Sequence, residues 1–257
     1  MVITLKTNRK IVNSRRNNIL LEVQTHNEVF VNSLSEKLNV SPLTIRRDLQ
    51  ILEEEGFVER FYGGARSKEN KNLNNNIDRK SKIIDSIAQF ASKYVEDNDT
   101  IFINSSKTVY KMIPYITSKN VTIITNNCHV LSLEQKPNIS IFLTGGELNE
   151  IKKSLTGEFA LGILNKVSAT KCFLGCSGIT KNGITTVIPQ EVSINERMLE
   201  RCVGKVYILA DDSKIGREYS FLSGSLDKVH SLITNACVSQ EIIEIQKKGV
   251  KVIQINI

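Results

Sequence analysis

Tryptophan is absent from this 257-residue sequence, proline occurs four times and cysteine five times. The cysteines are odd in number and form no Cys-x-x-Cys pair, so we expect free thiols rather than disulfides, a metal site or a redox motif. No segment approaches the roughly 20 apolar residues that span a membrane, and the first residues do not form a signal-peptide core. We therefore expect a cytoplasmic protein with no membrane partner.

Charge and length point toward a polyanionic partner and more than one domain. Lysine plus arginine number 34 against 27 aspartate plus glutamate, which gives a net charge of +7 and an isoelectric point near 9.1. This excess is typical of proteins that meet nucleic acid but is too small to establish such a partner. The length exceeds that of a typical single domain, and 40% hydrophobic residues suffice for a sizeable core.

One segment is predicted to be a helix with a packing face and an outward face. Ser41 can cap its first amides, and Pro42 suits the first turn, where a missing N–H costs nothing. At about 100° per residue, a stripe of Ile45, Leu49 and Leu52 faces inward. The opposite face and its flanks carry Leu43, Thr44, Arg46, Arg47 and Gln50. We expect Gly56 to end the helix.

The flanking residues complete a helix-turn-helix pattern at about residues 30–49. Leu34 and Leu38 lie four apart on a short helix, and residues 39–41 make a tight turn into the next one. Residues 57–62 are rich in aromatic and β-branched residues and end at two glycines, which predicts a β-ribbon, or wing. Residues 29–31 could supply its partner strand, and residues 14–24 a supporting helix.

A family resemblance adds to this pattern; it is carried by Asn39-Val40-Ser41, residues 44–49, Leu52-Glu53, Gly56 and Gly63-Gly64-Ala65. These residues resemble the N-terminal winged helix of the DeoR-type bacterial transcription regulators. The resemblance implies a DNA-binding domain at residues 14–65 and double-stranded operator DNA as partner. The residues expected at the DNA are Ser41, Leu43, Thr44, Arg46, Arg47, Gln50 and Arg60. The alternative is a small helical subdomain with an exposed charged face.

The rest of the chain is predicted to form an α/β domain. Residues 66–80 have almost no apolar content and read as a linker, so the second domain covers residues 81–257. Strands then alternate with helices in the manner of a mainly parallel sheet. The predicted strands are residues 100–103, 121–125, 139–143, 171–174, 205–209, 231–234 and 250–255. The predicted helices are residues 109–116, 155–167, 192–202 and 240–247.

Small polar and glycine residues directly follow several of these strands, as in the loops 104–108, 144–146 and 210–214. In open α/β sheets the carboxyl ends of the strands form the ligand crevice, so these loops predict an anion or phosphate site. The alternative is that such residues merely cap helices and turn the chain. No loop is a P-loop or a dinucleotide fingerprint, so we expect neither nucleotide-driven chemistry nor a cofactor.

The second domain also resembles the effector domain of the same regulators, which is related in fold to sugar-phosphate isomerases and CoA transferases. The residues that carry this resemblance are 122–126, 144–148, 155–157, 173–175, 178–179, Gly183, Glu191, Met198, Asp211, Ser213 and Lys214. The resemblance implies a phosphorylated sugar or related small metabolite as ligand. The residues expected to bind it are Asn104, Ser106, Lys107, Thr108, Thr125, Asn126, Gly145, Gly146, Gly175, Asp211 and Lys214.

Two departures from the family pattern bear on function. The family usually shows Asp-x-Gly-Ser/Thr-Thr where this chain has residues 104–108, and it commonly carries a lysine near Asn195. Losing the aspartate at Asn104 removes a proton acceptor, so we expect binding without turnover and no catalytic residue. Lys107 could add positive charge to a bound anion, or it could lie across the pocket toward Asp211 and block it.

We expect a DNA-binding transcription regulator, a repressor of a carbohydrate or related metabolic operon, whose DNA affinity changes when the metabolite binds. A single winged helix has a small footprint, so we also expect a homo-oligomer, either a dimer or a tetramer. The alternative is a sugar-phosphate isomerase-like enzyme that carries a winged helix. A third possibility is a regulator whose altered pocket binds nothing.

Overall fold

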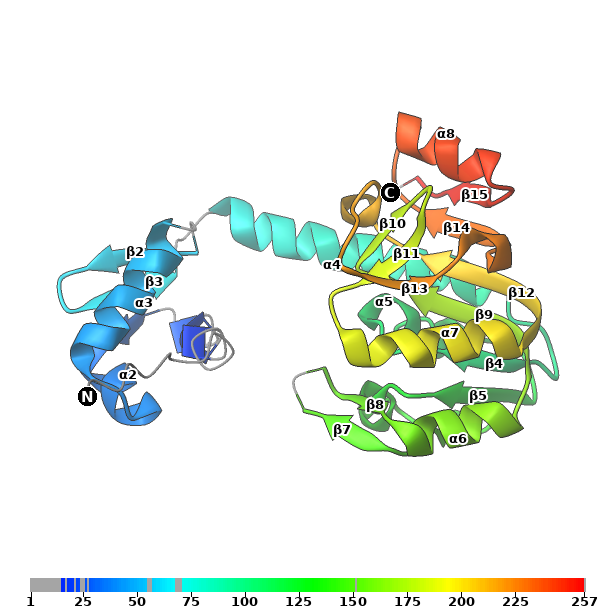
Figure 1. Cartoon of the computed structure of the whole chain (residues 1–257), viewed down its shortest axis with the longest axis horizontal. Helices are drawn as coiled ribbons and strands as arrows, with labels where there is room; N and C mark the ends of the chain where they lie inside the picture. Colours follow the sequence, from blue (N-terminus) through cyan, green and yellow to red (C-terminus); the bar gives the residue numbers. More distant parts are fainter. Residues whose placement is uncertain are drawn as a thin grey trace, which may run out of the picture. The chain divides into compact units, whose positions relative to one another are not determined.

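The computed structural model describes residues 15–16, 18–20, 22–23, 26, 28–54, 57–67, 71–150 and 152–256, without the side chains of residues 67 and 71–78. The chain divides into two compact units, Met1–Asp78 and Arg79–Ile257. Figure 1 labels the elements of each unit. No helix in the described ranges is long and apolar enough to cross a membrane.

The N-terminal unit is a helix-turn-helix with a β-ribbon. Helix α2 (Val31–Leu38) leads through Asn39, which has a left-handed backbone at φ 50°, into helix α3 (Pro42–Glu54). Strands β1 (Glu28–Phe30), β2 (Val58–Phe61) and β3 (Gly64–Ser67) form an antiparallel sheet in the order β1-β3-β2. The predicted helix pair and wing are therefore confirmed.

Capping and packing account for α3 as the sequence predicts. The Thr44 backbone N–H donates to Ser41 Oγ at 3.3 Å, so Ser41 caps the helix. Ile45, Leu49 and Leu52 are all buried in the core of this unit. The predicted end at Gly56 lies outside the described residues, and α3 itself ends at Glu54.

A buried carboxylate on α3 was not predicted. Asp48 is only 2% exposed and accepts hydrogen bonds from Arg15 Nε at 2.5 Å and Arg16 Nε at 3.0 Å. Both arginines precede the helix pair, in the segment predicted to support it. They tie that segment to α3, since a buried carboxylate needs such partners.

Helix α4 (Lys71–Ser92) begins ten residues before the predicted start at Ser81. The sequence predicts a linker at residues 66–80, whereas β3 extends to Ser67 and α4 starts four residues later. Ile83, Ile87 and Ala91 pack the later turns of α4 into a core. Once these turns are fixed, adding residues to the helix costs little, so polar residues extend it.

The C-terminal unit is built on a seven-stranded sheet with the order β15-β14-β12-β9-β4-β5-β6. All neighbouring pairs are parallel, so every carboxyl end lies at the same edge of the sheet. The strands are β4 (Thr100–Ile103), β5 (Val121–Thr125), β6 (Ile139–Leu143), β9 (Ala169–Gly175), β12 (Cys202–Leu209), β14 (Ser231–Thr234) and β15 (Lys251–Gln254). The predicted α/β domain with a mainly parallel sheet is confirmed.

Helices cover both faces of this sheet. On one face, Ile103 and Phe173 belong to the core that includes α4 and the short helix α5 (Lys107–Tyr110). On the other face, Phe102 and Leu174 belong to the core that includes α6 (Glu158–Lys166), α7 (Val192–Arg201) and α8 (Gln240–Lys247). Successive residues of a strand point to opposite faces, which explains the two cores.

The C-terminal unit also contains short antiparallel strands outside the main sheet, and these were not predicted. Strands β7 (Glu147–Asn149) and β8 (Ser154–Thr156) form a hairpin, and β10 (Gly178–Thr180), β11 (Gly183–Thr186) and β13 (Phe221–Gly224) form a small sheet. The helix predicted from residue 155 therefore starts at Glu158, and the one predicted at 109–116 is α5 followed by a single 3-10 turn.

A buried ion pair joins two central strands at the amino end of the sheet. Lys171, at the start of β9, lies 2.6 Å from Asp99 Oδ2 and 2.7 Å from Glu96 Oε2. Burial alone would raise the pKa of Asp99, but hydrogen bonds from Lys171, the Glu96 backbone N–H and Thr170 hold that pKa below its ordinary value. The pKa of Lys171 is raised, because contacts with the two carboxylates outweigh the opposing effect of burial.

We predict that Lys171→Met lowers the free energy of unfolding by about 3–5 kcal/mol, because it leaves Asp99 buried without its cation. Chemical denaturation at neutral pH measures the loss. Lys205→Met is the matched control, since Lys205 pairs in register with Lys171 on β12 but is exposed.

The pH dependence has a defined sign. Because the pKa of Asp99 is lower in the folded chain, its stabilisation is full above the ordinary aspartate value of 3.8 and is lost as the pH falls through the folded value. Stabilisation by Lys171 is lost only as the pH rises through a folded value above 10.5. The gap between wild type and Lys171→Met should therefore narrow in acid; a gap that stays constant from neutral pH into acid would contradict the ion-pair explanation.

Candidate functional site

Helix α3 presents an exposed basic face in the N-terminal unit. Leu43, Arg46, Arg47 and Gln50 are exposed, and Thr44 is half-buried. Neither Arg46 nor Arg47 forms an ion pair with a residue in the described part of the chain. Two uncompensated guanidinium groups on one helix are suited to bind phosphate or base edges.

The wing adds Arg60, which was predicted to contact DNA and which contacts Glu53, and the exposed aromatic residue Tyr62. Arg60 Nη1 lies 3.7 Å from Glu53 Oε2, and its backbone N–H donates to Glu53 Oε1 at 2.9 Å. Tyr62 lies at the turn between β2 and β3 and is fully exposed. Tyr62 was not among the residues predicted to contact DNA, although an aromatic residue beside Gly63-Gly64 was a signal for it.

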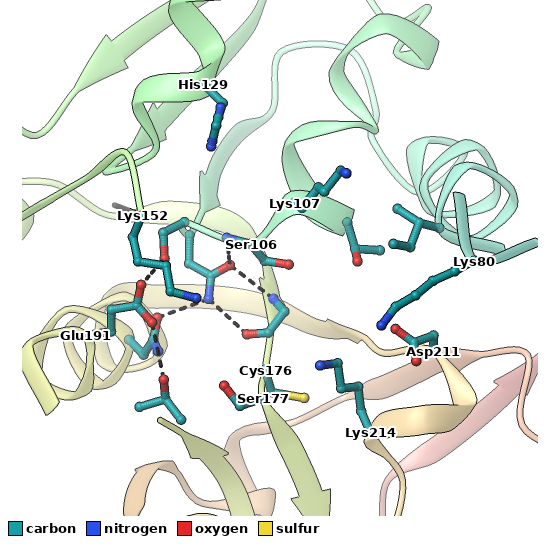
Figure 2. A pocket seen from close by; sticks show the side chains of 17 residues that line it. Lys80, Ser106, Lys107, His129, Lys152, Cys176, Ser177, Glu191, Asp211 and Lys214 are labelled. Carbon is teal, nitrogen blue, oxygen red and sulfur yellow. Dashed lines mark hydrogen bonds between the residues drawn. The ribbon is translucent and has the colours of Figure 1, made fainter. Parts of the chain in front are cut away.

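The C-terminal unit holds a cavity of about 360 Å³ where β4, β9 and β12 end. Figure 2 shows the side chains that line it. Most of the predicted ligand residues line this cavity: Asn104, Ser106, Lys107, Thr108, Gly175, Asp211 and Lys214. Their common position follows from the parallel sheet, which gathers the carboxyl ends of its strands.

Asn104 organises the loops around the cavity. Its Nδ2 donates to the carbonyl of Gly175 at 2.9 Å, and its Oδ1 accepts from the backbone N–H groups of Gly175 and Ser106 at 3.0 and 3.2 Å. Nδ2 also donates to Asn195 Oδ1 at 3.1 Å. The two departures from the family pattern are therefore in direct contact, as a neutral amide pair.

The cavity is positively charged. Lys80, Lys107, Lys152 and Lys214 line it, and none of them forms an ion pair with a residue that the structure describes. Figure 2 shows Lys80 and Lys214 directed toward the space beside Asp211. Such a set of ammonium groups would attract an anion.

The two carboxylates of the cavity are occupied by the protein itself. Glu191 accepts hydrogen bonds from Ser105 Oγ at 2.7 Å and Thr186 Oγ1 at 3.2 Å. Asp211 accepts from the Ser213 backbone N–H at 2.9 Å and from the Ser213 hydroxyl. Both carboxylates thus hold loops in place, and the lysines remain available.

Lys107 does not lie across the cavity. Its side chain is exposed and points away from Asp211 in Figure 2. The alternative in which Lys107 blocks the pocket therefore differs from the conformation seen here. At the start of α5, the lysine is placed at the rim instead.

Thr125, Asn126, Gly145 and Gly146 do not line this cavity. Thr125 is fully buried and donates to the carbonyl of Ile103 at 2.6 Å, while Asn126 Nδ2 donates to the carbonyl of Leu155 at 3.1 Å. These two donated hydrogen bonds join β5 to β4 and β8, whereas the buried Asn126 Oδ1 has no hydrogen-bond partner among the described residues. Gly145 and Gly146 line a separate hollow beside α6.

Several residues of the cavity were not among the predicted ligands. Lys80 lies in the segment predicted to be a linker, and Lys152 lies in the β7–β8 hairpin, so neither follows a strand of the main sheet.

Cys176 also lines the cavity. Burial raises the pKa of its thiol to about 12; the nearby Lys214 lowers this pKa and Asp211 raises it. Cys176 is therefore a neutral thiol at pH 7 rather than a nucleophile.

Comparison with known proteins identifies both units. The pattern of the DeoR-like helix-turn-helix domain matches residues 15–71, and that of the DeoR C-terminal sensor domain matches residues 76–236. The HTH-type transcriptional regulator IolR of Bacillus subtilis (strain 168) is 31% identical over 229 residues, which cover 85% of this chain and 89% of that protein.

A lactose phosphotransferase system repressor of Streptococcus mutans is 34% identical over 215 residues, which cover 80% of this chain and 85% of that protein. Among solved structures, ribose 5-phosphate isomerase A from Methanocaldococcus jannaschii is 13% identical with a TM-score of 0.36, over 52% of this chain and 54% of that one. That structural likeness is too weak to bear on function.

We predict that Gly175→Ala disrupts the cavity, because a Cβ atom at Gly175 would overlap Oγ and Cβ of Ser106. Overpacking of this kind costs about 1–3 kcal/mol, and it would also separate Asn104 from Gly175. Thermal unfolding measures the loss.

The double variant Gly175→Ala with Ser106→Gly serves as the control. Removing the Ser106 side chain removes the two nearest atoms, after which the next is Val109 Cγ2 at 3.6 Å. Most of the lost stability should return. If the second substitution gives no recovery, steric contact with Ser106 is not the reason that this position requires glycine.

Proposed function

This chain belongs to the DeoR family of transcription regulators, and from this premise we propose that it represses a carbohydrate or related metabolic operon in response to a phosphorylated metabolite. Residues 14–65 would bind operator DNA, and residues 81–257, together with Lys80, would bind the metabolite. The family assignment makes the chain a regulator rather than an isomerase-like enzyme. The names of the relatives, which include lactose phosphotransferase system repressors, support the carbohydrate assignment.

The proposed DNA contact places α3 in the major groove. Arg47 lies opposite the buried stripe of Ile45 and Leu49, which suits contact with base edges, whereas Arg46 lies to one flank, which suits contact with phosphate. Leu43 is 57% exposed at the start of the helix and could contact a thymine methyl group. The exposed, unpaired arginine pair is the observation that carries this proposal.

The proposed effector is a small phosphorylated sugar or a related metabolite. Lys80 and Lys214 would hold the phosphate, because they carry the free positive charge on the side of Asp211. Hydroxyl and amide groups such as those of Ser177, Thr108 and Asn195 line the remaining wall and suit a polar, hydroxylated molecule.

Helix α4 offers a route from the metabolite to the DNA-binding unit. Lys80 and Ile84 of α4 line the cavity, and the same helix begins at Lys71, four residues after β3 of the wing ends. A phosphate bound to Lys80 would therefore act on the segment that leads to the winged helix. If Lys80 contacts the phosphate in only one conformation of α4, the ligand favours that conformation and so changes the DNA affinity.

We also propose that the chain acts as a homo-oligomer, a dimer or a tetramer. One winged helix reads few base pairs, so useful discrimination requires two copies on repeated half-sites. The molar mass of the full chain in solution decides this.

We predict that Arg47→Ala weakens binding to the specific operator by about 1–3 kcal/mol and barely changes binding to random DNA. Arg46→Ala should weaken binding to both and reduce the salt slope by about one unit, because it removes a phosphate contact. Fluorescence anisotropy over a series of salt concentrations measures both effects.

Lys37→Ala serves as the control, because Lys37 is an exposed lysine on α2 that is paired with Glu22 at 2.8 Å. It should bind the operator nearly as wild type does. Equal losses on operator and random DNA for Arg47→Ala would argue against its assignment to base recognition.

We predict that phosphorylated sugars raise the melting temperature of the wild type, because they bind the native state. A hundredfold excess over Kd adds about 2.7 kcal/mol, which corresponds to several degrees. Lys80→Ala and Lys214→Ala should each abolish most of the shift, as should Lys107→Ser if Lys107 supplies charge to the anion. A panel of sugar phosphates in a thermal-shift assay provides the measurement.

Lys82→Ala is the matched control, since Lys82 is an exposed lysine on α4 that does not line the cavity. It should retain the full thermal shift. If the wild type shows no shift with any sugar phosphate and Lys107→Ser creates one, the blocked-pocket alternative is correct instead.

A further inference from the structure

Helix α6 exposes large apolar side chains. Phe159 is 83% exposed and Ile163 is 43% exposed, and on the neighbouring edge strand β6 Phe142 is 58% exposed. Charged residues bound this set, with Glu158 at the start of α6 and Lys166 at its end. We call Phe142, Glu158, Phe159, Gly162, Ile163 and Lys166 the α6 surface.

These side chains share one side of the C-terminal unit. Positions 159, 162, 163 and 166 recur at helical spacing, whereas Ala160 and Leu164 point into the core. Phe142 lies in register with Ile124, which packs in the same core as Ala160, so Phe142 and α6 lie on the same face of the sheet. Solitary exposed apolar residues are common, but several large ones on the same face mark an interaction surface.

A hollow lies beside Phe159. Thr144, Gly145 and Gly146 line it together with α6, and its volume is about 480 Å³. Gly146 has φ +113°, and a Cβ atom there would overlap the carbonyl of Thr156, so glycine is required for the backbone to pass close to β8. The α6 surface therefore carries both a projecting aromatic ring and a depression.

We propose that the α6 surface binds the α6 surface of a second copy of this chain about a two-fold axis. In a two-fold interface, a patch must be complementary to itself. A projecting Phe159 beside an apolar hollow meets this condition, because each copy would insert its ring into the hollow of the other. This inference rests on the proposed homo-oligomer and assigns a surface to it.

The charges on α6 fit the same arrangement. Glu158 and Lys166 are each four residues from Gly162, so antiparallel helices that cross at Gly162 bring Glu158 of each copy opposite Lys166 of the other. Neither residue forms an ion pair with any residue in the described ranges. Gly162 has no atom within 4 Å of where a Cβ atom would lie, which leaves room for two helices to approach closely.

The edge strand β6 also favours a second copy of the chain as the partner of this surface. β6 is the last strand of the sheet, and exposed edges are usually covered or charged. Residues 139–143 of β6 include no charged side chain. β6 therefore carries no side-chain charge that would repel the same strand of another copy. Polar groups at both ends of α6 and an apolar centre also match the usual layout of a protein interface.

Light scattering of the full chain tests the proposal. The wild type should have at least twice the 28.8 kDa mass of one chain, and Gly162→Arg should halve the measured mass, because it blocks close approach of the helices. Within one copy, nothing lies within 4 Å of the position of the new Cβ atom, and arginine has a higher helix propensity than glycine, so the substitution should not destabilise α6. An unchanged thermal unfolding curve in dilute protein establishes that the variant is folded.

Charge reversal supplies a second test that does not depend on bulk. Glu158→Lys and Lys166→Glu should each raise the dimer dissociation constant about tenfold or more, because every substitution acts twice in a two-fold interface. The double variant Glu158→Lys with Lys166→Glu should restore the wild-type constant. Failure of the double variant to recover would overturn the antiparallel pairing of α6.

Val238→Asp provides the matched control. Val238 is 69% exposed and precedes α8, which Figure 1 shows at the opposite end of the C-terminal unit from α6. It should leave the mass unchanged. A wild-type chain that is a monomer would overturn the proposed oligomer as well, whereas an oligomeric wild type whose mass is unaffected by Gly162→Arg would overturn only the assignment of this surface.

Discussion

The side-chain amide of Asn104 joins the ends of two neighbouring strands, and the cavity of the C-terminal unit depends on that link. It bonds both the N–H and the carbonyl of Gly175, and it also reaches Asn195 on α7. Gly175 in turn must be glycine because the Ser106 loop lies against it. A neutral amide supplies donors and acceptors together, so the link holds without adding negative charge near the lysines.

The sequence predicted those elements that are determined by interactions between residues close together in the chain. Ser41, Pro42 and the stripe of Ile45 and Leu49 defined α3 because capping and helical periodicity act within a few residues. The strands of the main sheet were predictable for the same reason, and the shared end of the parallel strands followed from topology. The sequence alone therefore identifies the loop after β4 as part of a candidate site.

Long-range contacts explain what sequence reasoning missed. Asp48 is one of several charged residues on α3, and its burial depends on Arg15 and Arg16, more than 30 residues away in the sequence. Lys80 enters the cavity only because the packing of later turns extends α4 through a polar segment. Gly145 and Gly146 follow a strand as ligand loops do, yet Gly145 serves a left-handed backbone turn and Gly146 serves close packing against Thr156, and periodicity does not distinguish these uses from ligand binding.

The two ends of β9 differ in how firmly they are held. Lys171 at its amino end is anchored by an ion pair with the buried carboxylate of Asp99, whereas Gly175 at its carboxyl end is held by neutral hydrogen bonds to a loop. Local opening of a protein follows such differences in contact strength, and binding regions are drawn from the less stable end. We therefore expect the protection of amide hydrogens along β9 to fall from Lys171 to Gly175, so that the regulator can rearrange its ligand loops while the amino end of the sheet stays closed.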